Sequence, residues 1–429
     1  MEKVINNLLE DNSLSFIEKL LSMKDIESKK VLSGDFTISS IDFVYSHDVT
    51  SPLIMHEFES MGGTKIWDNE KFLMNIDHEF PASTESGRKI HTDMKLFANK
   101  HHCKIQEGSN CHQYVLEKYA SPGMLIVGAD SHTNTVGALN CAGIGLGTSD
   151  VAFILKYGQT WFKVPKSIRI EVSGKLWPGV SVKDIALNVI STLGPEAANF
   201  ASVEWIGSLI ETLDIAQRAV LTNISTEMGA HNSVVGFDNT TKEFLDRSGR
   251  TDYTYIPLNT EASSYFKTFD FNAAEIAPMV ALPNGFERIL RVDEAGEIEI
   301  SVSVIGTCTN GRLNDLRAAA QIMKGSHVKP GVTLIVTPNS TEVYLQALKE
   351  GVIQTLVEAG AVVTSPGCGV CAGLQKGIVG PEDVVAFAGP RNFRGRLGSK
   401  DAKIYLVSPE TAAMSALTGR LFTKVSTER

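Results

Sequence analysis

The segment TSPGCGVCAG, residues 364–373, organises the sequence together with an earlier segment, IGTCTNGR, residues 305–312. Each segment overlaps or follows a short apolar run, residues 361–364 and 299–305, that predicts a buried strand. Both are rich in small, turn-forming residues, so each predicts a loop whose backbone can approach a ligand closely. Together the two segments hold three of the six cysteines: Cys308, Cys368 and Cys371.

Three thiolates can hold three corners of a cubic iron–sulfur cluster and leave the fourth iron without a protein ligand. An open position makes a metal centre a Lewis acid that can bind a hydroxyl. The spacing alone also permits a redox dithiol or a zinc half-site, although no second CxxC or HxxxH pair stands nearby to complete four zinc ligands. A thioredoxin-like motif opens a helix after a first strand, whereas this CxxC lies late in a long chain. The spacing therefore favours a cluster only modestly.

The composition bounds the class of protein. A length of 429 residues predicts two or three domains, and 43% hydrophobic with 21% charged residues is typical of a soluble enzyme. The net charge of −9, without a basic cluster, argues against a nucleic-acid partner. No apolar run approaches the roughly 18 to 20 residues that span a bilayer, and the N-terminus has no signal or transit pattern. Because scattered cysteines fit a reducing compartment, we expect a cytoplasmic protein without membrane contacts.

The predicted elements divide the chain into three α/β units. We expect these units over residues 1–165, 166–290 and 291–429. Pro165 precedes a strand of alternating character at the first boundary, and the last unit alternates strand, loop and helix in the manner of a parallel sheet with covering helices. The glycine-rich segment 142–150 lacks the last glycine and the acidic residue of a dinucleotide fingerprint, so it predicts a tight turn into a helix.

Histidines and carboxylates gather where predicted elements of the first unit begin or end. The candidates are His47, Asp77, His78, His112, Asp130, Ser131 and His132. A lone histidine is more often a satisfied core or surface residue. A carboxylate beside a histidine at a strand end can, however, fix the tautomer of the ring and raise its basicity, which is useful in acid–base catalysis.

Other charged residues have two interpretations each. Glu204 stands in an apolar segment, so it is either paired or functional. Glu227 lies among small residues, where a plain helix-end carboxylate is the structural alternative. Arg391, with Arg394 and Arg396, follows a predicted strand; such arginines suit bidentate recognition of a carboxylate, or form a solvated face.

Taken together, these residues resemble the large subunits of the aconitase superfamily, most closely the shorter type found in 3-isopropylmalate dehydratase and homoaconitase. The resemblance covers nearly the whole chain. The markers that carry it are HDVTSP (47–52), DH (77–78), CH (111–112), GADSHT (128–133), EMGA (227–230), GTCTNGR (306–312), PGCGVCAG (366–373) and RNFRGR (391–396).

The resemblance implies an α/β fold of three interlocked domains around a [4Fe–4S] cluster held by Cys308, Cys368 and Cys371, with one open iron. It also implies a hydro-lyase that dehydrates a hydroxy-carboxylic acid and rehydrates it at the neighbouring carbon. The most similar activity is the conversion of 2-isopropylmalate to 3-isopropylmalate in leucine biosynthesis. Homoaconitase, or a dehydratase of another substituted malate such as 2,3-dimethylmalate, stays open as an alternative.

Site roles follow from the same resemblance. The implied catalytic residues are Asp77, His78, His112, Asp130, His132, Glu227 and, as a weaker candidate, Glu204; the implied substrate-binding residues are His47, Ser131, Arg391 and Arg396. His78, paired with Asp77, is the implied acid that protonates the departing hydroxide. Asp130 and His112 form the second implied pair.

The sequence departs from the family pattern at two positions. Pro390 stands where relatives usually carry an asparagine that contacts the cluster, and proline has no side-chain donor. The CxxC encloses Gly369 and Val370, where Gly-Pro is common. Both changes are expected to lie against the cluster.

The resemblance also implies a partner. Single-chain relatives carry a fourth, swivelling domain with the serine base, and residues 407–429 are too few to encode it. We therefore expect a separate small subunit, in a heterodimer or heterotetramer. Some aconitase relatives act instead as cluster-sensing RNA-binding regulators, and the acidic balance of this chain weighs against that role.

Overall fold

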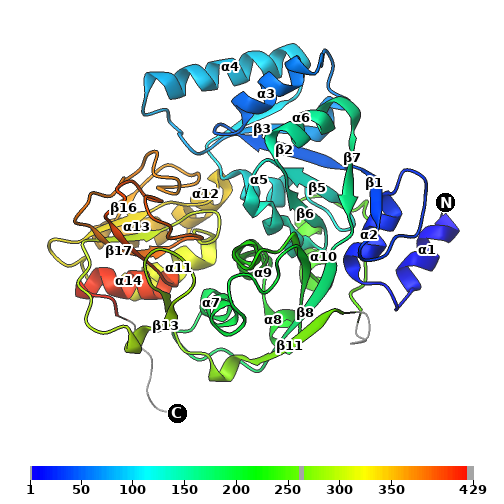
Figure 1. The fold of residues 1–429 in the computed structure, drawn as a ribbon. Coiled ribbons are helices and arrows are strands. Elements are labelled where there is room, and N and C mark those ends of the chain that lie inside the picture. The colour runs from blue at the N-terminus through cyan, green and yellow to red at the C-terminus, as the bar shows by residue number, and fades with distance from the viewer. Residues whose placement is uncertain (1, 260–264, 423–429) are drawn as a thin grey trace.

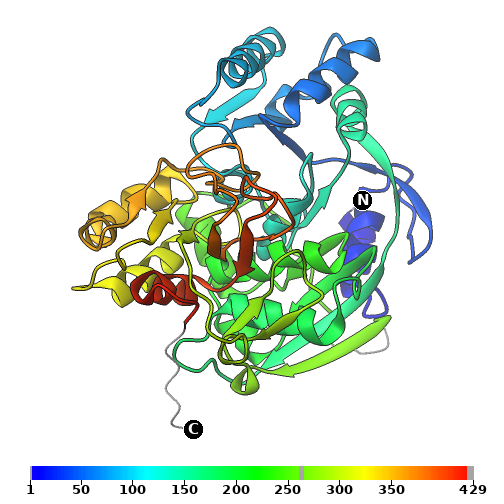
Figure 2. The same ribbon diagram turned by 60° about the vertical axis from the view of Figure 1, so that its left-hand side comes forward.

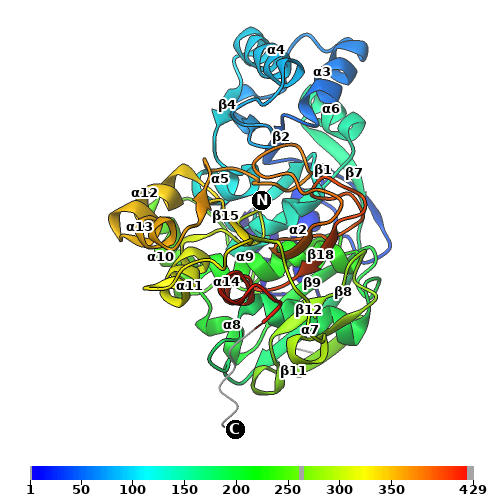
Figure 3. The same ribbon diagram turned by 90° about the vertical axis from the view of Figure 1, so that its left-hand side faces the viewer.

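Three sheets of four or more strands, built mainly from parallel strands, carry the architecture (Figure 1). The computed structural model describes residues 2–259 and 265–422. In Figure 1 the first sheet lies in the blue and cyan part at the top, and the second in the green part below it. The third lies in the yellow to red part at the left, which comes forward in Figures 2 and 3.

The first sheet has five parallel strands in the order β4-β3-β2-β5-β6. Its strands are β2 (Phe43–His47), β3 (Phe72–Ile76), β4 (Lys104–Glu107), β5 (Leu125–Gly128) and β6 (Ala142–Gly145). Its helices, with η for a 3₁₀ helix, are α3 (Ser51–Ser60), η1 (Asn69–Lys71), α4 (Glu85–His101), α5 (Cys111–Lys118), η2 (Ser131–Leu139) and α6 (Thr148–Tyr157). Every residue of β2, β3 and β5 is buried, as expected for parallel strands covered on both faces.

The second sheet has four parallel strands in the order β10-β9-β8-β11. Its strands are β8 (Lys166–Ser173), β9 (Ala201–Ile206), β10 (Asn232–Val235) and β11 (Lys267–Asn272). Its helices are α7 (Val182–Leu193), α8 (Ser208–Thr212), α9 (Ile215–Ile224), η3 (Ser225–Met228) and α10 (Asn239–Arg247). The predicted start of α7 is confirmed by a capping box, in which Ser181 and Asp184 satisfy the first amides of the helix.

The third sheet has seven strands in the order β13-β12-β18-β17-β14-β15-β16. Its strands are β12 (Met279–Ala281), β13 (Ile289–Arg291), β14 (Val302–Ile305), β15 (Thr333–Val336), β16 (Val362–Val363), β17 (Val384–Ala388) and β18 (Lys403–Leu406). Its helices are η5 (Ala273–Glu275), η6 (Val292–Glu294), α11 (Leu313–Met323), α12 (Thr341–Lys349), α13 (Val352–Glu358) and α14 (Pro409–Thr418). The strands from β14 to β18 are parallel, whereas β12 and β13 are antiparallel.

The expected domain boundary at residue 290 falls inside a hairpin of the third sheet. Strand β12 precedes that boundary, yet its Ala281 pairs with Leu406 of β18. The second and third sheets also share one hydrophobic core, in which Val203 and Val304 are both fully buried. The units are therefore packed against one another rather than joined by exposed linkers.

The N-terminal segment packs on the side of the molecule away from the third sheet (Figures 1 and 3). It contains α1 (Glu2–Glu10), α2 (Phe16–Lys24) and β1 (Phe36–Ser40), and β1 pairs antiparallel with β7 (Gln159–Lys163). The longest described helix, α4, has 17 residues, and no helix in the described part of the chain is long and apolar enough to cross a membrane.

Helix η2 fixes the first unit against the second. Thr222 Oγ1 donates a hydrogen bond to the Thr135 carbonyl at 3.1 Å, and Asn223 Nδ2 donates to Thr135 Oγ1 at 2.9 Å. The backbones come so close that a Cβ added to Gly137 would lie 1.7 Å from the carbonyl oxygen of Ser233. Because η2 begins directly after Asp130, this contact also fixes the histidine segment described below.

We expect Gly137→Ala to lower the free energy of unfolding by about 1–3 kcal/mol, because its methyl group has only backbone to displace. Thermal unfolding measures the effect. Gly236→Ala is the matched control, since its Cβ would make ordinary contact at 3.6 Å with Leu258 and should change stability by less than about 0.5 kcal/mol. Equal melting temperatures for the two variants would show that η2 and β10 can separate without cost.

Candidate functional site

The first cysteine loop leaves the carboxyl end of β14 and runs to α11. Gly306 has φ +121°, and a Cβ there would lie 2.0 Å from the carbonyl oxygen of Thr337, so only glycine fits. Cys308 is buried near the tip of this loop. The hydroxyl of Thr309 donates to Asn223 Oδ1 at 2.6 Å, which ties the loop to the second unit.

A fully buried arginine, Arg312, fixes this loop by hydrogen bonds to its carbonyl groups. Arg312 donates from Nη2 to the Cys308 carbonyl at 3.0 Å and from Nη1 to the Thr309 carbonyl at 2.6 Å. Its Nε donates to Gln113 Oε1 on α5 at 2.8 Å. The guanidinium thus turns the loop carbonyls toward itself and links the third unit to the first.

The second cysteine loop follows β16 and touches the first loop directly. Gly369 has φ +69°, and a Cβ there would lie 2.5 Å from the carbonyl oxygen of Gly306. Cys368 and Cys371 are both buried. Arg396 donates from Nη2 to the Cys371 sulfur at 3.0 Å, while its buried Nε has no hydrogen-bond partner in the described part of the chain.

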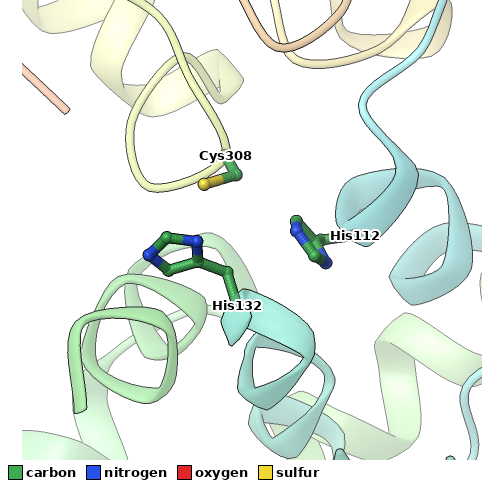
Figure 4. A group of neighbouring side chains, drawn as sticks. All are labelled: His112, His132 and Cys308. Atoms are coloured by element: carbon green, nitrogen blue, oxygen red, sulfur yellow. The ribbon is translucent and has the colours of Figure 1, made fainter. Parts of the chain in front are cut away.

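The three sulfurs predicted as ligands come together. Cys368 is a close neighbour of both other cysteines, and its interaction with Cys371 lowers the pKa of the Cys371 thiol to about 6. Figure 4 shows Cys308 facing His132, at the start of η2, and His112, on α5. The ligand atoms of these three residues lie within 4.8 Å of one another, so the cysteine loops face the histidines of the first unit.

Asp130 is the centre of the histidine group. Its Oδ1 lies 3.0 Å from His112 Nε2 and accepts the backbone N–H of His132 at 2.7 Å. Because a carboxylate only accepts, Nε2 of His112 faces Asp130 as the donor, and Nδ1 shares a hydrogen bond of 2.7 Å with the Tyr45 hydroxyl. His47 Nε2 lies 3.4 Å from Asp130 Oδ2 without hydrogen-bond alignment, so this buried atom is available to another group.

Asp77 and His78 form a second pair at the end of β3. His78 Nδ1 lies 3.0 Å from Asp77 Oδ1 and 3.5 Å from Asp48 Oδ1. Burial disfavours a charge on this ring, but the charges of Asp77 and Asp48 outweigh it and raise the pKa of His78 well above its usual value. The other oxygen of Asp77 accepts the Cys111 N–H at 2.7 Å, which orients the carboxylate. The ring of His78 stacks on that of His47 at a centroid distance of 4.0 Å.

Glu227 completes a third pair, where the second unit meets both the first and the third. Its Oε1 lies 3.0 Å from His132 Nε2 and accepts a hydrogen bond from Arg391 Nε at 2.6 Å. Burial disfavours a charge on His132, but the adjacent Cys308 sulfur and the carboxylates raise its pKa to about 9. Burial likewise opposes ionisation of Glu227, and its bond to His132 and the charge of Arg391 nevertheless lower its pKa.

The remaining candidates lie in different surroundings. Ser131 is exposed beside Asp130, and its carbonyl accepts the Thr226 hydroxyl at 2.9 Å. Arg394 lies on the surface beside Asp401, at 3.0 Å. Glu204 is a correction to the predicted set: it is fully buried on β9, where its carboxylate accepts the Phe16 N–H at 3.0 Å and the Tyr265 hydroxyl at 2.7 Å. It therefore docks α2 on the second sheet, and burial raises its pKa to about 7.

Sequence reasoning gave no role to two residues that the structure places in this group. Asp48 accepts backbone N–H groups of His78 and Glu79 at 3.0 and 2.8 Å and so shapes the turn after β3. Its position beside His47 in HDVTSP was a usable signal. Arg312 lies in the marker GTCTNGR, but nothing in the letters distinguishes a buried guanidinium from an exposed one.

Comparison with known proteins finds relatives along nearly the whole chain. The model of the aconitase family (aconitate hydratase) matches residues 18–297 and 291–419. The protein of Archaeoglobus fulgidus named 3-isopropylmalate dehydratase large subunit 1 is 38% identical over 411 residues, which cover 95% of this chain and 98% of that protein. The protein of the same name from Thermotoga maritima is 38% identical over 396 residues, covering 91% and 94%.

One solved structure supports the fold alone. The crystal structure of the holo-form of aconitase X from Thermococcus kodakaraensis superposes with a TM-score of 0.53 and covers 85% of this chain and 88% of that chain, at 13% identity. The predicted aconitase-like α/β fold is confirmed by this likeness and by the family match. From its matches over nearly the whole length, the chain belongs to the aconitase family.

Proposed function

We propose that this chain is the cluster-binding subunit of a hydro-lyase that converts 2-isopropylmalate to 3-isopropylmalate, a step of leucine biosynthesis. The observation that carries the reaction type is the position of buried Cys308, whose loop contacts the loop of Cys368 and Cys371, beside three histidine–carboxylate pairs. The substrate is supported by the relatives named 3-isopropylmalate dehydratase large subunit, which match over more than nine-tenths of the chain.

Membership of the aconitase family implies a [4Fe–4S] cluster, and the residues present fit one. Cys308, Cys368 and Cys371 would be its ligands, because their sulfurs gather in one buried place between two loops. The buried N–H of Arg396 that has no described partner suits a nearby anionic sulfur. When bound, such a cluster supplies Lewis acidity at an iron without a protein ligand.

His78 is the proposed general acid. The raised pKa keeps its imidazole protonated at neutral pH, and Asp77 holds the Nδ1 proton. Nε2 is then the atom that can deliver a proton to the departing hydroxide. The ring of His112 is held on both sides, by the Tyr45 hydroxyl and by Asp130, so it would help to orient the substrate hydroxyl.

Substrate carboxylates fit the positive groups at the rim. Arg391 is bound to Glu227, and its side chain is about one-fifth exposed, so it would remain accessible to a substrate carboxylate. Arg396, His47 and Ser131 would complete the grip: His47 Nε2 is buried without an aligned partner, and Ser131 is exposed beside Asp130. Glu227 and His132 would hold a water or hydroxyl between them and the reacting carbon.

The name of the relatives, large subunit, supports a small-subunit partner. That partner would supply the base that removes the proton from carbon. The chain alone is then expected to bind a cluster and turn over little substrate.

The function is tested by producing the chain with the small subunit encoded nearest to it and reconstituting both anaerobically with iron and sulfide. Alkene absorbance is followed with 2- and 3-isopropylmalate, homocitrate, citrate and 2,3-dimethylmalate. We expect a clear preference for the isopropylmalates. Preference for another acid would contradict the assignment to leucine biosynthesis but support the same type of reaction. No turnover from a preparation with a full cluster would refute the proposal.

Cys371→Ser should lose the cluster and lower turnover by more than about 100-fold. Substituting a residue that only hydrogen-bonds to a metal ligand usually costs about 10- to 100-fold. The fold should survive, because one loop thiol contributes little to three packed units. Iron and sulfide content, circular dichroism and turnover are measured together. Cys103→Ser is the matched control, as Cys103 is a half-buried free cysteine outside the loops. Wild-type iron content in Cys371→Ser would disprove the ligand assignment.

Asp77→Asn should move the basic limb of the pH profile of kcat/KM to lower pH. A general acid works only while it is protonated, so activity is lost as the pH rises through the pKa of His78. A neutral asparagine at position 77 removes the charge that raises this pKa, so the loss occurs at lower pH. At pH 8 we expect a loss of about 10²- to 10⁴-fold. Asp93→Asn, which changes an exposed carboxylate on α4, is the control and should leave the profile in place. An unshifted limb in Asp77→Asn would rule out His78 as the acid.

A further inference from the structure

Lys183 is a buried lysine outside the groups that surround the cysteines and histidines. It is the second residue of α7, its exposed fraction is 1%, and its Nζ donates to the carbonyl oxygen of Gly389 at 2.6 Å. The bond crosses from the second unit to the loop that follows β17 in the third. In the described part of the chain this ammonium is bound to a carbonyl and forms no ion pair, which makes its burial costly.

The carbonyl that Lys183 holds belongs to an unusual peptide unit. Because residue 390 is proline, the Gly389–Pro390 peptide has no N–H, so the carbonyl is its only polar group. No side chain could help to fix it from residue 389 either, since a Cβ on Gly389 would lie 2.0 Å from the ring of Phe387. The orientation of this peptide therefore depends on Lys183.

Arg391 follows immediately and lies between two anchors. On its other side Asn392 is buried, with Nδ2 donating to the Leu282 carbonyl at 2.6 Å and Oδ1 accepting the Gly285 N–H at 3.1 Å. Asn392 ties the loop to its own sheet, whereas Lys183 ties it to the second unit. That unit also carries Glu227, the acceptor of the Arg391 guanidinium at 2.6 Å.

Two of the charged groups that act on Lys183, Glu227 and Cys308, belong to the candidate site. Burial lowers the pKa of Lys183 to about 8, and the charges of Glu227 and Cys308 act in the opposite direction. The adjacent Asp184 is already used, because it accepts the backbone N–H groups of Ser181 and Met279, each at 2.8 Å. Asp315, the other acidic group that acts on Lys183, accepts the Gly311 N–H at 2.7 Å.

We propose that Lys183 is a positioning residue, which fixes the Gly389–Pro390 peptide and thereby the direction in which Arg391 meets Glu227. It does not touch the reacting atoms. The proposal rests on the proposed function, where Arg391 and Glu227 take part in the reaction. It also gives Pro390 a consequence: without an N–H at this position, the loop relies on a donor from another unit.

Amide hydrogen exchange of the full chain tests the structural half without any activity measurement. Lys183→Met should speed exchange of the amides of residues 391–396 by about tenfold or more, as expected for a lost charge-assisted hydrogen bond. Lys19→Met is the matched control, because Lys19 is equally buried and donates to the Leu9 carbonyl at 3.1 Å, on α2 away from the cysteines. It should leave those amides unchanged. Unchanged exchange of 391–396 in Lys183→Met would overturn the proposal.

A second variant guards against a general loss of folding. Lys183→Arg keeps a charged donor, and Lys183 lines a cavity of about 100 Å³ that offers room for the extra atoms. Amide exchange of residues 391–396 in Lys183→Arg should remain close to that of the unchanged chain. Fast exchange in Lys183→Arg, with the rest of the chain protected, would contradict a role based on the donor.

A double-mutant cycle on kcat/KM of the reconstituted complex tests the functional half. Lys183→Met and Arg391→Gln should each lower kcat/KM about 10- to 100-fold, and the double variant should resemble Arg391→Gln, because one residue acts through the other. Losses that multiply would overturn the coupling. An inactive complex of the unchanged proteins, with fast exchange in Lys183→Met, would count against the proposed function and still support the positioning of the loop.

Discussion

The site depends on the hydrogen bonds that the buried guanidinium of Arg312 donates. A loop that presents a sulfur at its tip must direct its carbonyl groups elsewhere, and inside a protein those carbonyls need donors. Arg312 supplies them for Cys308 and Thr309 and reaches Gln113 of the first unit with the same planar group. A point charge such as lysine could not serve three acceptors in this fork geometry. The position of the first cysteine is thus set by a contact between units and not by the loop alone.

Around the sulfurs, the charges are arranged so that each histidine has a carboxylate and each carboxylate has more than one donor. Asp130 serves His112 and the backbone of His132, and Asp77 serves His78 and the amide of Cys111. The backbone donors fix the carboxylates, and the carboxylates fix the rings. Burial alone would strip the charge from such imidazoles; here the paired carboxylates prevail for His78 and, with the Cys308 sulfur, for His132. The result is a polar group that is preorganised before any ligand enters.

Sequence was sufficient for the parts of the fold that depend on local pattern. The helices over residues 182–193 and 409–418 begin and end as predicted, because caps and apolar periodicity are local signals. The meeting of the cysteine loops could also be predicted, since both leave the carboxyl ends of strands in one parallel sheet. The pairing of β12 with β18 could not, because it joins residues more than a hundred positions apart. Glu204 shows the same limit of sequence-based prediction. A carboxylate in an apolar strand is expected to have a partner, but the sequence does not indicate that one partner is the start of an N-terminal helix.

The packing of η2 on the second unit has a consequence for how the site admits a ligand. Gly137 and Ser233 meet backbone to backbone, and Thr135 is bonded to two residues of α9, so neither unit can swing away from the other without breaking the core. Enzymes that enclose their substrates often do so by hinge motion between two domains of one chain. In this molecule the contacts of η2 with α9 and β10 instead hold the histidine segment and the second unit together as one body. A ligand that reaches His132 and Glu227 therefore meets side chains whose relative positions are already fixed, and no closure of these two units is needed to assemble them.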